Sequence, residues 1–140
     1  MARVASRPRT LTQRIEERID RKKGDVFMRE DFRDLGGYRE VGRSLRELTQ
    51  SGKLLRIGQG LYSRASTSPF DGRVIPVKSL YRLTQEAFAR LGIETRPIKA
   101  QQDYNEGRST QMPVGRVIGV TRRVRRKVSA NGATMGYERA

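Results

Sequence analysis

The chain has 140 residues, and its 30 Lys and Arg against 15 Asp and Glu give a formal net charge of +15 at pH 7. It contains no Cys and no His, which excludes disulfides, thiolate catalysis, Ser–His or Cys–His triads and nearly every kind of zinc site. Hydrophobic residues make up 35% of the sequence, so we expect a modest core in one domain, or in one domain with a small appendage.

The chain begins with a basic segment. Residues 1–9 contain Pro8 and the arginines Arg3, Arg7 and Arg9, and we expect them to form a flexible arm. Basic arms can follow the minor groove of DNA, although a plain disordered tail has the same composition. No apolar core of a signal peptide is evident, and no stretch approaches the ~20 apolar residues of a membrane span. We therefore expect a cytoplasmic protein without membrane contact.

The segment 10–64 has the patterns of three helices followed by a β-hairpin. The first helix should begin at Thr10, because Thr10 and Gln13 have the spacing of a capping box. Gly36-Gly37 separates the second helix from the third, and Gly58-Gln59-Gly60 has the form of a tight hairpin turn. The expected elements are helices from 10 to a stop at 22–24, over 29–35 and over 38–51, a short strand at 26–27, and strands at 54–57 and 61–64. This order is that of a winged helix-turn-helix DNA-binding domain.

The second half of the chain predicts a linker and a small C-terminal part. Residues 65–78 are rich in Ser, Thr, Pro and Gly and are expected to be a linker, and 79–140 a small α/β subdomain. The expected elements are a helix over 79–91, a weakly patterned segment over 93–113, and strands over 114–121, 122–129 and 133–137. Asn131-Gly132 is a strong signal for a type I′ turn between the last two strands. The predicted fold class is α+β: a winged helix-turn-helix with a small C-terminal helix-plus-β-hairpin extension.

The third helix carries the candidate base-reading face. At about 100° per residue, Val41, Leu45 and Leu48 form one inward stripe. The opposite face then bears Arg39, Arg43, Arg46, Glu47 and Gln50. Arg pairs with guanine, Gln with adenine and Glu with cytosine in the major groove, whereas a plain solvated helix surface is the alternative. Tyr38 could contact DNA or cover the core. Gly42 costs about 1 kcal/mol relative to Ala inside a helix, which indicates a close contact with another helix or with DNA.

A second set of residues is predicted to hold the phosphate backbone. The expected backbone contacts are Arg7 and Arg9 of the arm, Arg56, Gln59 and Arg64 of the hairpin, and Arg123, Arg125 and Lys127 of the 122–129 strand. Alternation along a strand would put the last three on one face. The hairpin glycines could serve turn geometry alone, and a charged strand edge could serve to prevent aggregation.

Several of these motifs resemble a known family. The segment 25–36, the spacing of Leu45, Leu48, Gly52 and Leu54, and above all the stretch Arg56-Ile57-Gly58-Gln59-Gly60-Leu61-Tyr62 resemble AbiEi-type antitoxins and their winged-helix relatives. The resemblance covers residues 10–64 and, more loosely, 105–140. It implies a winged helix that binds operator DNA, often that of its own promoter, and a C-terminal part that opposes a toxin. Met28 and Gln59 depart from the Ser or Thr and the Arg that are common in relatives.

Charge and motifs together predict a non-enzymatic protein that binds double-stranded DNA sequence-specifically, as a repressor or autoregulator of antitoxin type. A small domain with this charge repels itself unless a polyanion neutralises it, and the guanidinium fork favours phosphate and guanine. Without a convergent carboxylate pair or a phosphate-binding glycine loop, we expect no catalytic residue, metal or cofactor. Two alternatives stay open: an antitoxin that acts mainly by contact with a toxin protein, and an RNA- or ribosome-associated protein. Both a monomer and a dimer are compatible with the sequence.

Overall fold

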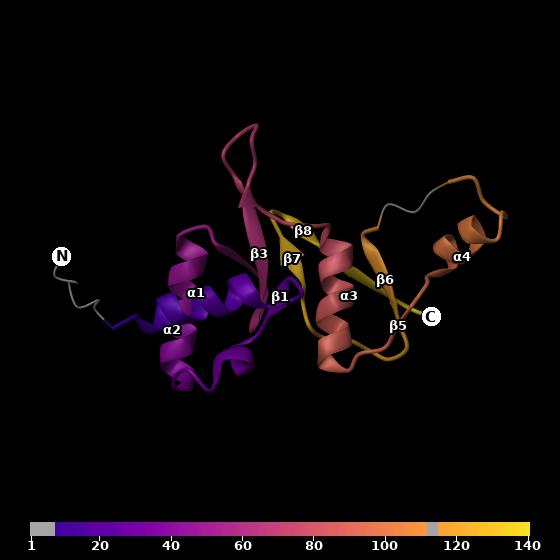
Figure 1. The fold of residues 1–140 in the computed structure, drawn as a ribbon. Helices are drawn as coiled ribbons and strands as arrows, with labels where there is room; N and C mark the ends of the chain where they lie inside the picture. The colour runs from indigo at the N-terminus through magenta and orange to yellow at the C-terminus, as the bar shows by residue number, and fades with distance from the viewer. Residues whose placement is uncertain (1–7, 112–114) are drawn as a thin grey trace.

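Residues 8–111 and 115–140 are described by the computed structural model of the protein, and within them the chain has a mixed α+β fold (Figure 1). The helices are α1 (Leu11–Arg21), the 3-10 helix η1 (Arg29–Phe32), α2 (Tyr38–Gln50), α3 (Leu80–Leu91) and α4 (Lys99–Asn105). The strands are β1 (Val26–Phe27), β2 (Leu54–Gly58), β3 (Leu61–Thr67), β4 (Val74–Pro76), β5 (Thr95–Arg96), β6 (Val117–Val120), β7 (Ser129–Ala130), β8 (Ala133–Thr134) and β9 (Gly136–Arg139). No helix within these ranges has both the length and the apolar character to cross a membrane.

Local signals place the first and third predicted helices correctly. The Thr10 hydroxyl accepts a hydrogen bond from the Gln13 N–H and the Gln13 side chain accepts one from the Thr10 N–H, which confirms the capping box of α1. The predicted inward stripe of α2 is buried, with exposed fractions of 1% for Val41, 0% for Leu45 and 4% for Leu48. This stripe packs in one hydrophobic cluster with residues of α1, β1 and η1.

The second predicted helix is shorter than expected. Instead of a helix over 29–35, the structure has the four-residue 3-10 helix η1. The Asp31 carboxylate accepts a hydrogen bond from the Met28 N–H, which closes the first turn locally, and the Leu35 N–H donates to the Phe32 carbonyl just beyond it. This tight geometry buries Phe32 completely in the cluster below α2.

Strand β3 is the central strand of the first sheet. It pairs antiparallel with β1 on one side and β2 on the other, and its far end pairs with β4. The expected linker over 65–78 is therefore wrong in its first and last parts, because β3 continues to Thr67 and the chain returns as β4. Figure 1 shows this β3–β4 hairpin extending beyond the body of the fold, with α1 and α2 on one side of β3 and α3 on the other.

The C-terminal half builds a second sheet and a second hairpin. Strands β5, β6 and β9 pair in that order, with β6 and β9 parallel, and α3 contacts β5 and β6. The predicted Asn131-Gly132 turn is confirmed, since both residues have positive φ, 50° and 84°, between β7 and β8. Strand β5 and helix α4 lie in the segment 93–113, for which the weak pattern predicted no element.

The prediction of a strand over 122–129 is the main error in this half of the chain. Only Ser129 is in a strand, and residues 122–128 cross the surface without sheet pairing. The segment is held instead by single contacts: the Arg126 carbonyl accepts from the Tyr137 hydroxyl, the Val128 carbonyl accepts from the Met135 N–H, and the Val128 side chain is buried. These contacts hold Arg126 and Val128 without a strand ladder, and Arg126 is exposed although alternation predicts it on the same face as the buried Val128.

One hydrophobic cluster joins the two halves of the chain. Val26 of β1, Met28, Ile57 of β2 and Leu61 of β3 are buried together with residues of the C-terminal half. The latter are Leu83, Ala87, Phe88, Ile118, Val120, Val128 and Met135. The β2–β3 hairpin is thus packed from both sides. The cluster that contains Val41, Leu45 and Leu48 lies on one side, and this shared cluster lies on the other.

Arg64 of β3 completes the C-terminal end of α1. Its Nη2 donates to the carbonyls of Ile19 at 2.6 Å and Lys22 at 2.5 Å, and its Nε donates to the Gly24 carbonyl at 3.1 Å. The guanidinium also pairs with Asp25 at 3.2 Å. A cation at this end of a helix also interacts favourably with the helix dipole.

Replacing Arg64 by Met should therefore destabilise the fold. The carbonyls at the end of α1 lose their donor, and we expect the free energy of unfolding to fall by about 1–3 kcal/mol in urea denaturation. Arg73→Met is the matched control, because the Arg73 side chain is 78% exposed and its ion pair is with Asp71, two residues away. Equal stabilities of the two variants would contradict the capping role of Arg64.

Candidate nucleic-acid interface

The outward face of α2 lies in solvent as the sequence predicts. Arg39, Arg43, Arg46 and Gln50 are all exposed, opposite the buried Val and Leu stripe. None of these four side chains is drawn into the core, so they form a row along one helix.

Two residues at the edges of this face, Glu47 and Tyr38, make contacts that the sequence does not predict. Glu47 is exposed, but its carboxylate accepts a hydrogen bond from the Thr12 hydroxyl of α1 at 2.7 Å, so it is held toward α1 and away from the arginines. Tyr38 does not cover the core, because it is 74% exposed. The guanidinium of Arg29 lies over its ring, 4.2 Å from the centroid.

A groove of about 500 Å³ runs between α2 and the β2–β3 hairpin. We call it the α2–hairpin groove; its lining includes Arg29, Tyr38, Gly42, Arg46, Thr49, Arg56, Gln59 and Gly60. The structure explains why residue 42 is a glycine, because a Cβ at this position would lie 2.7 Å from the Arg29 Cζ. The close contact that an interior helix glycine predicts is thus made by a guanidinium of the same chain.

The basic segment 122–127 lies beside the hairpin. A second hollow of about 680 Å³ shares Tyr38, Gln59 and Gly60 with the α2–hairpin groove and is lined further on by Arg122, Arg123, Arg125 and Arg126. Arg126 Nη1 donates to the Gln59 carbonyl at 2.9 Å. A Cβ on Gly58 would lie 2.8 Å from the Lys127 carbonyl oxygen. The structure therefore brings residues far apart in the sequence to the two sides of one turn.

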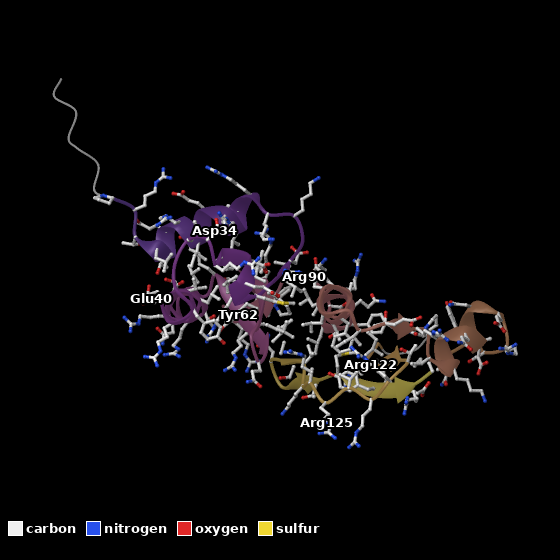
Figure 2. All side chains as sticks on the ribbon, turned by 90° about the horizontal axis from the view of Figure 1, so that it is seen from below. Asp34, Glu40, Tyr62, Arg90, Arg122 and Arg125 are labelled. Atoms are coloured by element: carbon white, nitrogen blue, oxygen red, sulfur yellow. The ribbon has the colours of Figure 1, made fainter. Side chains whose placement is uncertain are left out.

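These cations gather on one side of the molecule. Figure 2 shows Arg125 along the same lower edge as the nitrogen-tipped side chains below Glu40 and Tyr62. We call the set the basic surface: it comprises Arg29, Arg39, Arg43, Arg46, Arg56, Arg122, Arg123, Arg125, Arg126 and Lys127. Arg123, Arg125 and Lys127 are exposed as expected, although the strand that was to align them is absent.

Two other predicted backbone contacts, Arg64 and Arg9, do not join the basic surface. The guanidinium of Arg64 donates to carbonyls at the end of α1 and pairs with Asp25, so it is not free for the predicted phosphate contact. Arg9 pairs with Glu17 of α1 at 2.6 Å. Arg3 and Arg7 lie outside the described residues.

Within the described residues, the cations of the basic surface form no ion pair, and the same holds for other exposed cations such as Arg14, Lys23 and Arg82. None of the ion pairs among residues 8–111 and 115–140 involves a cation of α2, of β2 or of segment 122–127. Elsewhere, carboxylates hold cations such as Arg18, Lys53, Lys78 and Arg90. The positive charge of the basic surface is therefore not neutralised from within.

Sequence reasoning missed three members of this surface. Arg29 was placed on a helix without a role, and Arg122 and Arg126 were set apart from Arg123 and Arg125 by strand alternation. For Arg29 a signal existed, because the interior glycine Gly42 already required a close neighbour. For the other two, the contact of segment 122–127 with the hairpin is long-range, and no local pattern reports it.

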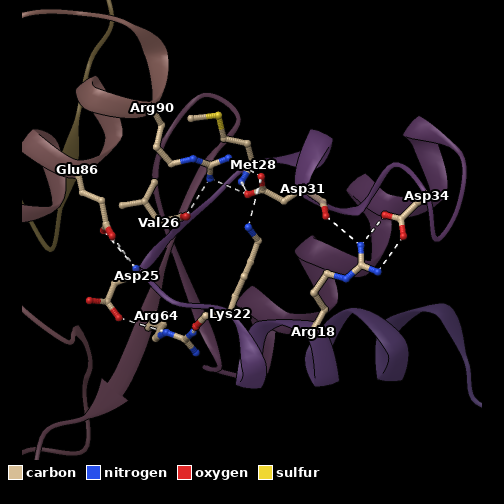
Figure 3. Close-up of polar contacts among 10 residues, drawn as sticks. All are labelled: Arg18, Lys22, Asp25, Val26, Met28, Asp31, Asp34, Arg64, Glu86 and Arg90. Carbon is tan, nitrogen blue, oxygen red and sulfur yellow. Dashed lines mark hydrogen bonds and ion pairs between the residues drawn. The ribbon is translucent and has the colours of Figure 1, made fainter.

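Asp31 fixes the position of η1 and hence of Arg29. Its side chain is 6% exposed and accepts hydrogen bonds from Arg90 of α3, 2.7 Å from Nη1, and from the Met28 N–H at 2.9 Å, with Lys22 at 3.9 Å (Figure 3). Burial raises the pKa of the Asp31 carboxyl, but the hydrogen bonds from Arg90 and Met28 and the charges of Arg90 and Lys22 outweigh it and hold the pKa below its ordinary value.

Fold and surface together define a small basic α+β protein with an un-neutralised, arginine-lined face. Residues 14–139 match the Family of unknown function (DUF6088), and the chain belongs to this family. Comparison with curated proteins and with solved structures gives no match. The resemblance to AbiEi-type antitoxins stays a prediction.

The lowered pKa of Asp31 predicts a pH-dependent stability. A carboxyl with a depressed native pKa stabilises the fold above its unfolded pKa of about 3.9 and loses this contribution as the pH falls through the native pKa. Asp31→Asn should therefore lower the free energy of unfolding by about 1–3 kcal/mol at pH 7. Urea denaturation should show this difference shrinking below about pH 4.

Asp34→Asn is the control for this measurement. The Asp34 side chain is 62% exposed and pairs with Arg18 alone. A pH-independent loss in Asp31→Asn, or a loss no greater than in Asp34→Asn, would show that Asp31 does not stabilise the fold as a carboxylate.

Proposed function

We propose that this protein binds double-stranded DNA sequence-specifically, and that residues 10–64 form a winged helix-turn-helix. The order α1, β1, η1, α2, β2, β3 and the pairing of β1 with β3 support this assignment. The major groove of B-DNA is wide enough to admit an α-helix. In this docking, α2 enters the major groove, η1 lies toward the backbone, and the β2–β3 hairpin is the wing.

The observation that carries the proposal is the un-neutralised basic surface. It joins α2, the hairpin and segment 122–127, while every ion pair of the described residues lies elsewhere. Repulsion among these cations is relieved when a polyanion neutralises them. Phosphate contacts of this kind supply a large share of the affinity of DNA-binding proteins.

The residues of the basic surface fall into two groups, one expected to contact base edges and one expected to contact phosphates. Arg39, Arg43, Arg46 and Gln50 project from α2 and are the candidates for base edges. Arg56 and segment 122–127 flank the helix and are the candidates for phosphates, which position the protein without reading sequence. The resemblance to AbiEi-type antitoxins supports the role that we propose, a repressor or autoregulator.

Selection from a pool of randomised duplexes tests the proposal. The full chain should enrich one sequence family, and its affinity should fall steeply with salt because bound phosphates release counterions. Binding without any enriched sequence would leave a non-specific polycation and overturn sequence-specific recognition. Preference for structured RNA over every duplex would favour an RNA-binding protein instead.

Replacing Arg43 by Ala should weaken specific binding. An arginine that contacts a guanine contributes about 1–3 kcal/mol to discrimination, so affinity for the enriched duplex should fall by that amount and one position should lose its preference. Arg82→Ala, an exposed arginine of α3 outside both hollows, is the control. Equal weakening on all duplexes would remove Arg43 from the base-reading set.

Replacing Arg125 by Ala should change the salt dependence rather than the sequence preference. One lost phosphate contact reduces the slope of log affinity against log salt by about 0.9. The control is Arg108→Ala, because Arg108 pairs with Asp103 and Glu106 in and after α4. A slope unchanged from the wild type would place segment 122–127 off the DNA.

A further inference from the structure

Arg29 is held in an unusual position for a surface arginine. It is the first residue of η1, and its guanidinium lies across α2, over the Tyr38 ring at 4.2 Å and against the bare backbone of Gly42. Tyr38 and Gly42 are one helical turn apart on the same side of α2. The stem and plane of Arg29 are therefore fixed by the fold before any ligand arrives.

The Arg29 guanidinium has no acceptor within the part of the chain that the structure describes. Among residues 8–111 and 115–140, no hydrogen bond and no ion pair is formed by the Arg29 side chain, although its neighbour Glu30 also lines the groove. By contrast, carbonyls and carboxylates occupy two other partly buried arginines of this protein, Arg18 and Arg64. A partly buried guanidinium that is fixed but unpaired is a donor fork open to an external anion.

Two further guanidiniums line the same hollow. Arg46 comes from α2 and Arg56 from β2, so three separate elements contribute one cation each to the α2–hairpin groove of about 500 Å³. Gln59 and Gly60 of the hairpin turn line its far end. Clustered guanidinium forks recognise phosphate oxygens, which accept several hydrogen bonds at once.

We propose that the α2–hairpin groove is a phosphate-binding site with Arg29 as its central ligand. This inference rests on the proposed function: when α2 lies in the major groove, a DNA strand borders the helix, and one phosphodiester of it would enter the groove. Arg46 and Arg56 contact the same phosphate or its neighbours. Gly42 serves the site by leaving room for Arg29, and Tyr38 by stacking on it.

The test compares Arg29→Ala with Arg33→Ala on the duplex that selection enriches. Arg33 is an exposed arginine four residues further on that lines neither hollow, which makes it a matched loss of charge. Arg29→Ala should reduce the salt slope by about 0.9 and weaken all duplexes by about ten- to a hundredfold. Arg29→Lys should restore the slope, since it restores the charge, but not the full affinity.

A second variant tests the position of the Arg29 guanidinium without changing the net charge of the protein. Gly42→Ala keeps the net charge but places a Cβ where the Arg29 guanidinium lies, so it should weaken binding in the wild-type background and have little effect when Arg29 is already Ala. Thermal unfolding of each variant confirms that it is folded. Additive losses from Gly42→Ala and Arg29→Ala would contradict the proposed geometry.

Duplexes with a single neutral methylphosphonate identify the ligand. A methylphosphonate at one position of the strand that borders α2 should weaken binding of the wild type and leave binding of Arg29→Ala unaffected. If the wild type binds no duplex, the proposed function fails; if it binds and Arg29→Ala matches Arg33→Ala, this inference alone fails. Should no methylphosphonate matter while adenosine monophosphate binds in an Arg29-dependent way, the phosphate belongs to a free nucleotide and the assignment to DNA is overturned.

Discussion

The placement of carboxylates decides which cations of this chain are left for a partner. With a net charge of +15, repulsion is the constraint that every part of the fold must satisfy. Acidic side chains satisfy it on the scaffold, where Asp31 holds Arg90 and Lys22, and Asp25 holds Arg64 and Lys78. Along α2, β2 and segment 122–127 the cations have no such partner within the described residues, so a bound polyanion would relieve the repulsion among them.

The same ion pairs, together with a hydrophobic cluster, also connect the elements that carry the basic surface. Asp31 ties η1 to α3, while the cluster around Val26, Met28 and Phe88 joins the hairpin to the C-terminal half. Segment 122–127 is fastened to the hairpin by the Arg126–Gln59 hydrogen bond. The four stretches of sequence that carry these cations are thus held together before binding, which lowers the entropy that assembling them would cost. The C-terminal half contributes to the surface both directly and as its support.

Sequence reasoning succeeded where the signal is local. The capping box of Thr10, the apolar stripe of α2 and the Asn131-Gly132 turn each depend on residues a few positions apart, and all are found as predicted. It failed where contacts between distant parts of the chain determine the role of a residue or the shape of a segment. The roles of Arg64 and Glu47 depend on α1, which lies far away in the sequence, and segment 122–128 is shaped by contacts with Gln59 and Tyr137 rather than by a strand ladder. Of the candidate site, the face of α2 was foreseeable, whereas the groove around Arg29 required the structure.

Amide chemical-shift mapping of the full chain with a selected duplex tests the central claim most directly. The account predicts that the largest perturbations fall on α2, on the β2–β3 turn and on residues 122–127 at once, and that excess salt reverses them together. Perturbations confined to the exposed faces of α1 and α3, with α2 unaffected, would contradict the assignment of the basic surface as the DNA-binding face.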